Sequence, residues 1–179
     1  MKGVSGLEWT IDSAHTQANF AVRHMAVTTV RGRFDNITGK VEVQDGKLVN
    51  AAIDIPTTSV NTNEPDRDKH LKSADFFDAE NHPTMHFSMT SAQQVSGDEY
   101  KLSGNLTIRD ITHPVTLDAT ISQSFTDPWG NERIGISLTG KLDRKAWNLT
   151  WNVLVEAGRF LVSDEVKVEV DAQIFHPKG

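Results

Sequence analysis

The residues best suited to chemistry lie in one stretch, where Arg67, Asp68 and His70 follow one another within four positions. An aspartate and a histidine would suggest a hydrolase triad if a serine joined them. The chain has no Gly-x-Ser-x-Gly motif, and no serine stands out as a nucleophile. Two other interpretations stay open. These side chains could contact an anionic head group of a ligand, or they could form a solvated helix face with an ion pair inside the helix.

Histidine and cysteine usage bears on metal and redox chemistry. The chain has seven histidines and no cysteine, so a thiolate nucleophile, a sulfur-bound metal and a disulfide framework are excluded. His82 and His86 would share one face of a strand, but Pro83 lies between them and no third ligand is evident. We therefore expect no catalytic residue, no metal and no cofactor. His24 stands among apolar residues, either as a hydrogen-bonded core histidine or as a ligand contact.

Length, charge and hydropathy limit the class of protein. A chain of 179 residues is expected to form a single domain, 1–179. The net charge of −6 and the lack of a basic run argue against nucleic acid and against electrostatic docking on anionic lipid. The first residues lack the apolar core of a signal peptide, and no segment approaches the ~20 apolar residues of a membrane span. We expect a cytoplasmic protein without stable membrane insertion, and a homodimer stays open.

Alternation of apolar and polar residues dominates the chain and predicts half-buried strands. Turn signals at Asp45-Gly46, Gly97-Asp98 and Thr112–Pro114 separate these segments. We also predict a strand over Trp147–Val153, and a return strand that turns Val49 inward. About eight alternating strands joined by hairpins form an antiparallel sheet, and closure into a barrel removes its exposed edges. The predicted fold is all-β, a single antiparallel barrel.

One insertion, at about 64–80, does not alternate. Its spacings of three and four predict a short helix with an apolar side formed by His70, Leu71, Ala74 and Phe77. Pro65-Asp66 is a start signal, and the residues before Pro83 are a stop signal. Adjacent side chains cannot both face one side of an ideal helix. We therefore expect one of Phe76 and Phe77 to pack on the helix or the outer wall, and the other to contact the barrel mouth.

The inward positions of the predicted strands are apolar. Phe87, Leu106 and Ile136 lie in mid-strand on this face, and the face also carries three glycines, Gly39, Gly104 and Gly140. Each glycine could mark a bend or bulge needed for closure, and together they could also leave unfilled volume along the axis. An apolar lining favours an apolar ligand. Burial of ten carbons contributes roughly 8 kcal/mol. The cost of association, on the order of 4–15 kcal/mol, can cancel this gain. A long hydrocarbon is therefore the better ligand.

Several short motifs occur in a specific order along the chain: Asp12-x-x-His15, Phe20-x-Val22-x-His24, Gly32-x-Phe34, Arg67-Asp68-x-His70-Leu71, Phe76-Phe77-Asp78, Leu106-Thr107-Ile108, Thr112-x-Pro114-Val115, Arg144-x-x-Trp147 and Ser163-Asp164-Glu165-Val166. This ordered set, over a core of about 8–174, resembles the YceI-like proteins. The resemblance implies an extended, lipocalin-like barrel that holds a polyisoprenoid chain in an interior tunnel. A long-chain isoprenoid lipid is thus the expected ligand and partner.

Strand parity and the resemblance together select candidate ligand-binding residues along the tunnel. They are Phe20, Val22, His24, Phe34, Phe76, Phe77, Phe87, Leu106, Ile108, Ile136, Trp147, Leu149 and Trp151. Arg67 and His70 are the candidates for head-group contacts. A tunnel that is open and one that is filled by Trp147 and Trp151 are both compatible with the sequence.

Three functions follow from this reading. The leading hypothesis is a non-enzymatic protein that binds, stores or transports a long-chain polyisoprenoid lipid, such as a quinone or its prenyl precursor. The alternative is an enzyme or stress-response factor acting on an isoprenoid-like substrate. A third is a packed barrel that serves protein interaction, its tunnel vestigial.

Overall fold

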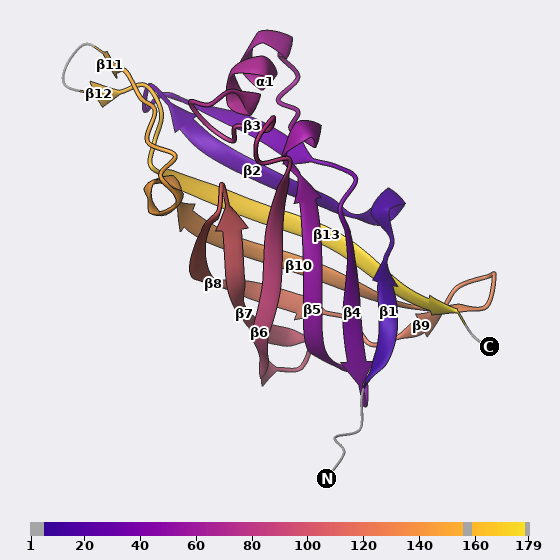
Figure 1. Ribbon diagram of the computed structural model, residues 1–179. Coiled ribbons are helices and arrows are strands. Elements are labelled where there is room, and N and C mark those ends of the chain that lie inside the picture. The colour runs from indigo at the N-terminus through magenta and orange to yellow at the C-terminus, as the bar shows by residue number, and fades with distance from the viewer. Residues whose placement is uncertain (1–5, 156–158, 178–179) are drawn as a thin grey trace.

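The computed structural model describes residues 6–155 and 159–177, most of which belong to one continuous antiparallel sheet (Figure 1). The strands are β1 (Leu7–Ile11), β2 (Gln17–His24), β3 (Thr28–Phe34), β4 (Thr38–Gln44), β5 (Lys47–Pro56), β6 (Thr84–Ser96), β7 (Glu99–Ile108), β8 (Ile111–Ile121), β9 (Phe125–Thr126), β10 (Asn131–Asp143) and β13 (Glu165–Pro177). A separate small hairpin pairs β11 (Leu154–Val155) with β12 (Arg159–Phe160). The helical segments are η1 (Ser13–His15), η2 (Thr57–Ser59), α1 (Pro65–Lys72) and η3 (Arg144–Trp147).

Strand β13 closes the sheet into a barrel. One edge of β13 pairs with β10 along the whole strand, from Asp143↔Glu165 to Asn131↔Pro177. Its other edge is shared, because β2 pairs with Lys167–Asp171 and β1 pairs with Ile174 and Phe175. The segments β1 and β2 therefore act together as one long interrupted strand, and β3 and β4 act as another. Counted this way, the barrel has eight antiparallel strands, which confirms the predicted fold.

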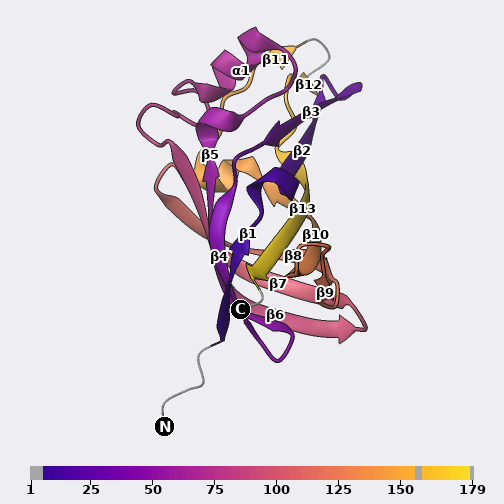
Figure 2. The same cartoon turned by 90° about the vertical axis from the view of Figure 1, so that its right-hand side faces the viewer.

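The barrel is built differently at its two ends. Figures 1 and 2 show α1 at one end, together with the tips of β2 and β3 and the β11–β12 hairpin, whereas both termini lie away from α1. Buried residues divide accordingly. One core cluster, with Trp9, Val41 and Ile174, occupies the closed half, and a second, with Phe34 and Trp147, lies toward α1. No helix in the described part of the chain is both long and apolar enough to cross a membrane.

The three inward glycines do not leave open space. A Cβ atom on Gly104 would lie 2.4 Å from Cζ of Phe87, and one on Gly140 would lie 2.3 Å from Cδ2 of Leu117. A Cβ atom on Gly39 would lie 2.5 Å from the carbonyl oxygen of Ala52. A neighbouring side chain or backbone therefore uses the room that each missing Cβ provides. This corrects the interpretation that the glycines leave unfilled volume. The register of β6 against β7 shifts between Met89 and Ser91, next to the Met89–Gly104 pair, which agrees with the interpretation of a bend or bulge at Gly104.

Two strand predictions are wrong for local backbone reasons. A bulge shifts the register of β4 against β5 between Glu42 and Val43, so that Leu48 is buried and Val49 is 46% exposed. A bulge reverses which residues face inward, and the alternation alone does not show it. The second error concerns the turn before β8, which lies at Arg109-Asp110, both with positive φ, rather than at Thr112–Pro114.

The predicted helix begins where expected but ends early. Glu64 caps α1 by accepting hydrogen bonds from the backbone N–H groups of Asp66 (3.3 Å) and Arg67 (2.7 Å). At the other end, the Ser73 hydroxyl donates to the carbonyl of His70 at 2.5 Å. Such a side-chain bond competes with the next helical turn. The helix ends at Lys72, and the following residues, Phe76 and Phe77 among them, form turns.

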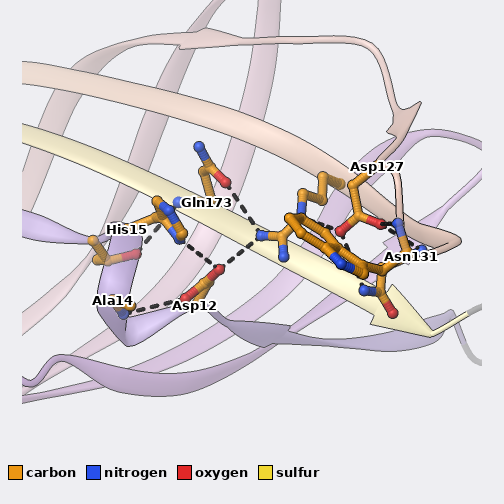
Figure 3. A network of polar contacts seen from close by, with 9 residues as sticks. Asp12, Ala14, His15, Asp127, Asn131 and Gln173 are labelled. Atoms are coloured by element: carbon orange, nitrogen blue, oxygen red, sulfur yellow. Dashed lines mark hydrogen bonds and ion pairs between the residues drawn. The ribbon is translucent and has the colours of Figure 1, made fainter.

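A polar network outside the barrel joins β10 and β13 to the turn after β1 (Figure 3). The Arg133 guanidinium donates to Asp12 Oδ2 and to Asp127 Oδ2, each at 2.7 Å, and to Gln173 Oε1 at 3.2 Å. Asp127 also accepts from the backbone N–H groups of Trp129 and Asn131, each at 2.9 Å. Burial raises the pKa of the Asp127 carboxyl, but these hydrogen bonds outweigh it and hold that pKa well below its usual range.

The network makes the free energy of unfolding depend on pH in the acidic range. A carboxyl whose pKa is lowered on folding stabilises the fold above its unfolded pKa, about 3.9, and that contribution is lost as pH falls through the folded pKa. We expect Asp127→Asn to lower the free energy of unfolding at neutral pH, and the deficit to shrink below about pH 4. Urea denaturation at several pH values measures this. Asp118→Asn, on an exposed carboxylate paired with Lys101, is the control; a deficit for Asp127→Asn that is the same at all pH values would contradict the prediction.

Candidate functional site

A cavity of about 610 Å³ occupies the inside of the barrel. Apolar side chains from every long strand line it, among them Ile11, Val41, Ala51, Met85, Leu102, Leu117, Leu138 and Val168. Its inner end is formed by buried residues such as Leu48 and Ile136, whereas lining residues at the α1 end, such as Arg23 and Asp66, are exposed. The cavity is therefore closed at one end and reaches the surface beside α1.

All of the candidate residues from the sequence line this cavity. They are Phe20, Val22, His24, Phe34, Phe76, Phe77, Phe87, Leu106, Ile108, Ile136, Trp147, Leu149 and Trp151, with Arg67 and His70 at the α1 end. Their contact with a ligand stays a prediction. The inward valines of β13 also line the cavity, and the regular alternation of Val166, Val168 and Val170 could have found them. Leu161 and Val162 come from an irregular segment that gives no such signal.

Aromatic rings form two groups on the cavity wall. Phe34 contacts Phe20 with ring centroids 5.5 Å apart, and it meets Phe77 edge-on at 5.4 Å. Phe76 meets His70 edge-on at 5.2 Å and lies 5.5 Å from Trp151. The expectation that only one of Phe76 and Phe77 would reach the interior is wrong. The helix has already ended before them, so the spacing rule for an ideal helix does not apply.

The predicted strand over Trp147–Val153 is also wrong. The chain forms the 3₁₀ helix η3, and Asn148 then adopts a left-handed conformation with φ of 60°. Nearby, the buried Arg144 side chain donates to the carbonyl oxygens of Leu149 (2.6 Å), Trp151 (2.9 Å) and, on the returning segment, Ser163 (2.9 Å) and Val162 (3.4 Å). These carbonyls are thus satisfied by a guanidinium rather than by a neighbouring strand, which the alternation cannot reveal.

Arg144 thereby positions one wall of the cavity. Its burial lowers the pKa of the guanidinium, which the nearby carboxylates of Asp164 and Asp143 oppose, and the group keeps its charge. The loop that it holds presents Leu149 and Trp151 to the cavity. Trp147 is held separately, because its indole N–H donates to the carbonyl of Leu106 at 2.9 Å.

Polar side chains gather where the cavity reaches the surface. Arg67 donates from Nε to Thr62 Oγ1 (2.8 Å) and from Nη2 to the Thr62 carbonyl (2.9 Å). Asp68 accepts from the Thr62 N–H and hydroxyl, at 2.8 and 2.6 Å, whereas His70 Nε2 lies 2.9 Å from Asp75 Oδ2. Asp68 and His70 therefore have separate partners. Among the described residues, Arg67 forms no ion pair with a carboxylate, which leaves a positive charge beside an apolar cavity.

The described residues include no candidate metal site. Within residues 6–155 and 159–177, no group of three or more histidine, aspartate or glutamate side chains is placed to hold a metal ion. His82 instead lies beside two aspartates, Asp78 at 3.9 Å and Asp110 at 3.4 Å. The expected absence of a metal and of a cofactor stays a prediction.

Fold and site together define a class: a closed eight-stranded antiparallel barrel, lipocalin-like, with an apolar interior that opens at one polar end. The sequence model of the YceI-like domain matches residues 9–174. The chain belongs to the YceI-like family, which confirms the resemblance seen in its motifs.

Relatives and solved structures agree with this assignment. Protein YceI of Salmonella newport is 35% identical over 147 residues, which cover 80% of this chain and 76% of that protein. The crystal structure of the Campylobacter jejuni YCEI protein is 26% identical, with a TM-score of 0.75 over 87% of this chain and 90% of that one. A polyisoprenoid binding domain from Saccharophagus degradans, implicated in plant cell wall breakdown, has a TM-score of 0.73 at 16% identity and covers 94% of this chain and 98% of that one.

The role given to Arg144 predicts a large stability loss when its guanidinium is removed. Arg144→Met leaves several loop carbonyls without a donor, and each unsatisfied buried group costs about 1–3 kcal/mol. We expect a loss of about 3 kcal/mol or more in urea denaturation. Lys145→Met, on the exposed neighbour that pairs with Asp164 at 3.0 Å, should cost under about 1 kcal/mol. Equal losses in the two variants would contradict this role.

Proposed function

We propose that this protein binds a long-chain polyisoprenoid lipid, with the tail inside the barrel and the polar head at the α1 end, and that it stores or transports this lipid without chemical change. One observation carries the proposal. The cavity of about 610 Å³ is apolar along its depth and reaches the surface beside Arg67, whose guanidinium is bonded to Thr62 and forms no ion pair with the residues that the structure describes. Its size lies within the range of pockets that bury most of a ligand of some hundreds of daltons.

The energetics favour a long tail over a small apolar molecule. Burial of about twenty carbons contributes roughly 16 kcal/mol of favourable free energy. The cost of association is on the order of 4–15 kcal/mol, so a tail of this length leaves a net gain. The aromatic groups around Phe34 and Phe76 add flat contact surfaces for branched, unsaturated units. At the mouth, the Arg67 guanidinium would donate hydrogen bonds to a phosphate or a carbonyl oxygen of the head group. A quinone and a prenyl precursor both meet these requirements.

The polar groups of the cavity support binding rather than catalysis. Asp68 is occupied by Thr62, His70 by Asp75, and Arg144 by backbone carbonyls. A catalytic Asp–His pair would need the two side chains to contact each other and a nucleophile. The barrel shared with the polyisoprenoid binding domain of Saccharophagus degradans supports the same ligand class at the level of fold. An enzyme acting on an isoprenoid-like substrate is the less favoured alternative.

Extraction of the purified protein with organic solvent, followed by mass spectrometry, tests the ligand class directly. We expect a bound lipid whose mass belongs to a series spaced by one isoprene unit. Reloading of the stripped protein from detergent then measures affinity. Straight-chain fatty acyl lipids alone, or no uptake of any prenyl lipid, would reject the proposal.

A cavity-filling variant tests the location. Leu138 faces the cavity from β10, and its neighbour Thr139 is exposed on the outer face of the same strand. Leu138→Trp would displace three or four methylene groups of the tail, so we expect affinity in the reloading assay to fall by roughly 2–3 kcal/mol, or about 30- to 150-fold. Thr139→Trp is the matched control and should bind as the wild type does. Loss of binding in both variants, or in neither, would contradict a tail inside the barrel.

A further inference from the structure

The hairpin of β2 and β3 has an apolar tip that its turn geometry does not explain. Met25 is 42% exposed and Val27 is 66% exposed. Met25 and Ala26 both adopt left-handed backbone conformations, with φ of 52° and 55°. Asn, Asp and Gly tolerate such positions best. A polar turn would thus fold more easily and expose less apolar surface, which points to a role for these side chains outside the fold.

This tip borders the mouth of the cavity. Val22 and His24, the residues just before it, line the cavity. The Met25 N–H donates to the Leu161 carbonyl at 2.8 Å, and the Leu161 N–H donates to the Val153 carbonyl at 2.9 Å. Val153 is 45% exposed. Figures 1 and 2 both place the β2–β3 tip beside the β11–β12 hairpin, at the α1 end. Met25, Val27 and Val153 are defined here as the apolar rim.

The charge beside the apolar rim is opposite to that of the whole protein. Residues 17–34 contain three arginines and no carboxylate, although the chain carries a net charge of −6. Arg33 pairs with Asp35 at 3.3 Å, at the base of the hairpin. Across the part of the chain that the structure describes, neither Arg23 nor Arg31, which are nearer the tip, forms an ion pair. Arginines next to exposed apolar side chains combine the electrostatic and the apolar contribution by which proteins bind the surface of anionic bilayers.

We propose that the apolar rim and the adjacent arginines dock on an anionic lipid bilayer, so that the cavity mouth faces the membrane and the isoprenoid tail passes directly between bilayer and barrel. The transfer of an isoprenoid tail rests on the proposed function, whereas the docking on the bilayer does not. Screening limits electrostatic contacts to about 8–10 Å in physiological salt. Glu64 and Asp66 line the cavity on the α1 side of the mouth, so the attraction comes from the β2–β3 side, where Arg23 and Arg31 lie beside the apolar rim. Docking through that side brings these arginines within this distance of the lipid head groups.

A second exposed apolar site, which is formed by aromatic residues, provides an internal control. Trp129 is 81% exposed and Phe125 is 50% exposed, and both belong to the β9 region, which Figure 1 shows far from the β2–β3 tip. A protein that adhered to lipid through any exposed apolar group would depend on Trp129 at least as much as on Met25. Docking by the apolar rim predicts no such dependence.

The test uses the purified full chain and co-sedimentation with vesicles of phosphatidylcholine alone or mixed with phosphatidylglycerol. The wild type should bind the mixed vesicles and lose binding in high salt. Met25→Asn with Val27→Ser keeps a favourable turn and should reduce binding at least tenfold. Arg31→Gln, which alters an exposed residue outside the cavity lining, should reduce it about fivefold. Trp129→Ser should bind as the wild type does. Urea denaturation confirms that each variant is folded.

The outcomes separate this inference from the proposed function. Absence of wild-type binding to the mixed vesicles, unchanged binding in both the Met25→Asn/Val27→Ser variant and Arg31→Gln, or loss of binding in Trp129→Ser would overturn the docking. Loading with a prenyl lipid from detergent tests the cavity without a membrane, and the Met25→Asn/Val27→Ser variant and Arg31→Gln should both load as the wild type does. Slower transfer from vesicles into these two variants, at unchanged loading from detergent, would establish the proposed route. Transfer rates equal to that of the wild type would overturn it.

Discussion

Backbone pairing between β10 and β13 is the constraint on which the rest of this structure depends. A sheet of alternating strands has two exposed edges, and the ladder from Asp143↔Glu165 to Asn131↔Pro177 removes them by closing the sheet on itself. Closure gathers the apolar face of every strand around one axis. At eight strands, the interior is wide enough for one ligand but too narrow for a water-filled channel. The cavity is thus a consequence of strand number and closure rather than of any single residue.

Two arginines stabilise parts of the structure that the β10–β13 ladder does not reach. Arg133 holds the outer seam through Asp12 and Asp127, where hydrogen bonds keep both carboxylates ionised. Arg144 supplies donors to a loop that has no partner strand, and so turns irregular backbone into a wall of the cavity. In both places one planar group with several N–H donors serves acceptors from distant parts of the chain, which a lysine could not do with the same geometry.

The mouth shows how local surface chemistry can differ from the average. Net charge describes the field at a distance, and by that measure the protein avoids anionic surfaces. Within a Debye length, however, the nearest charges dominate. The β2–β3 hairpin brings Arg23 and Arg31 together beside Met25 and Val27, near the mouth of the cavity. This arrangement fits the proposed carrier role, because a lipid with a long tail is costly to expose to water even briefly.

The sequence alone determined the barrel and most of its lining, because strand alternation follows from the twofold period of an extended chain and is written in the residue order. It also placed the start of α1, from the Pro65-Asp66 signal, whereas the capping role of Glu64 came from the structure. It could not determine the bulge that turns Val49 outward, because alternation does not show where the register of β4 against β5 shifts. Nor could it determine the loop after Arg144, because a buried guanidinium rather than a neighbouring strand bonds the carbonyls of this loop. The same is true of the charge at the mouth. Only the tertiary structure decided which arginines form no ion pair with the described residues, since ion pairing depends on distance in space and not on sequence composition.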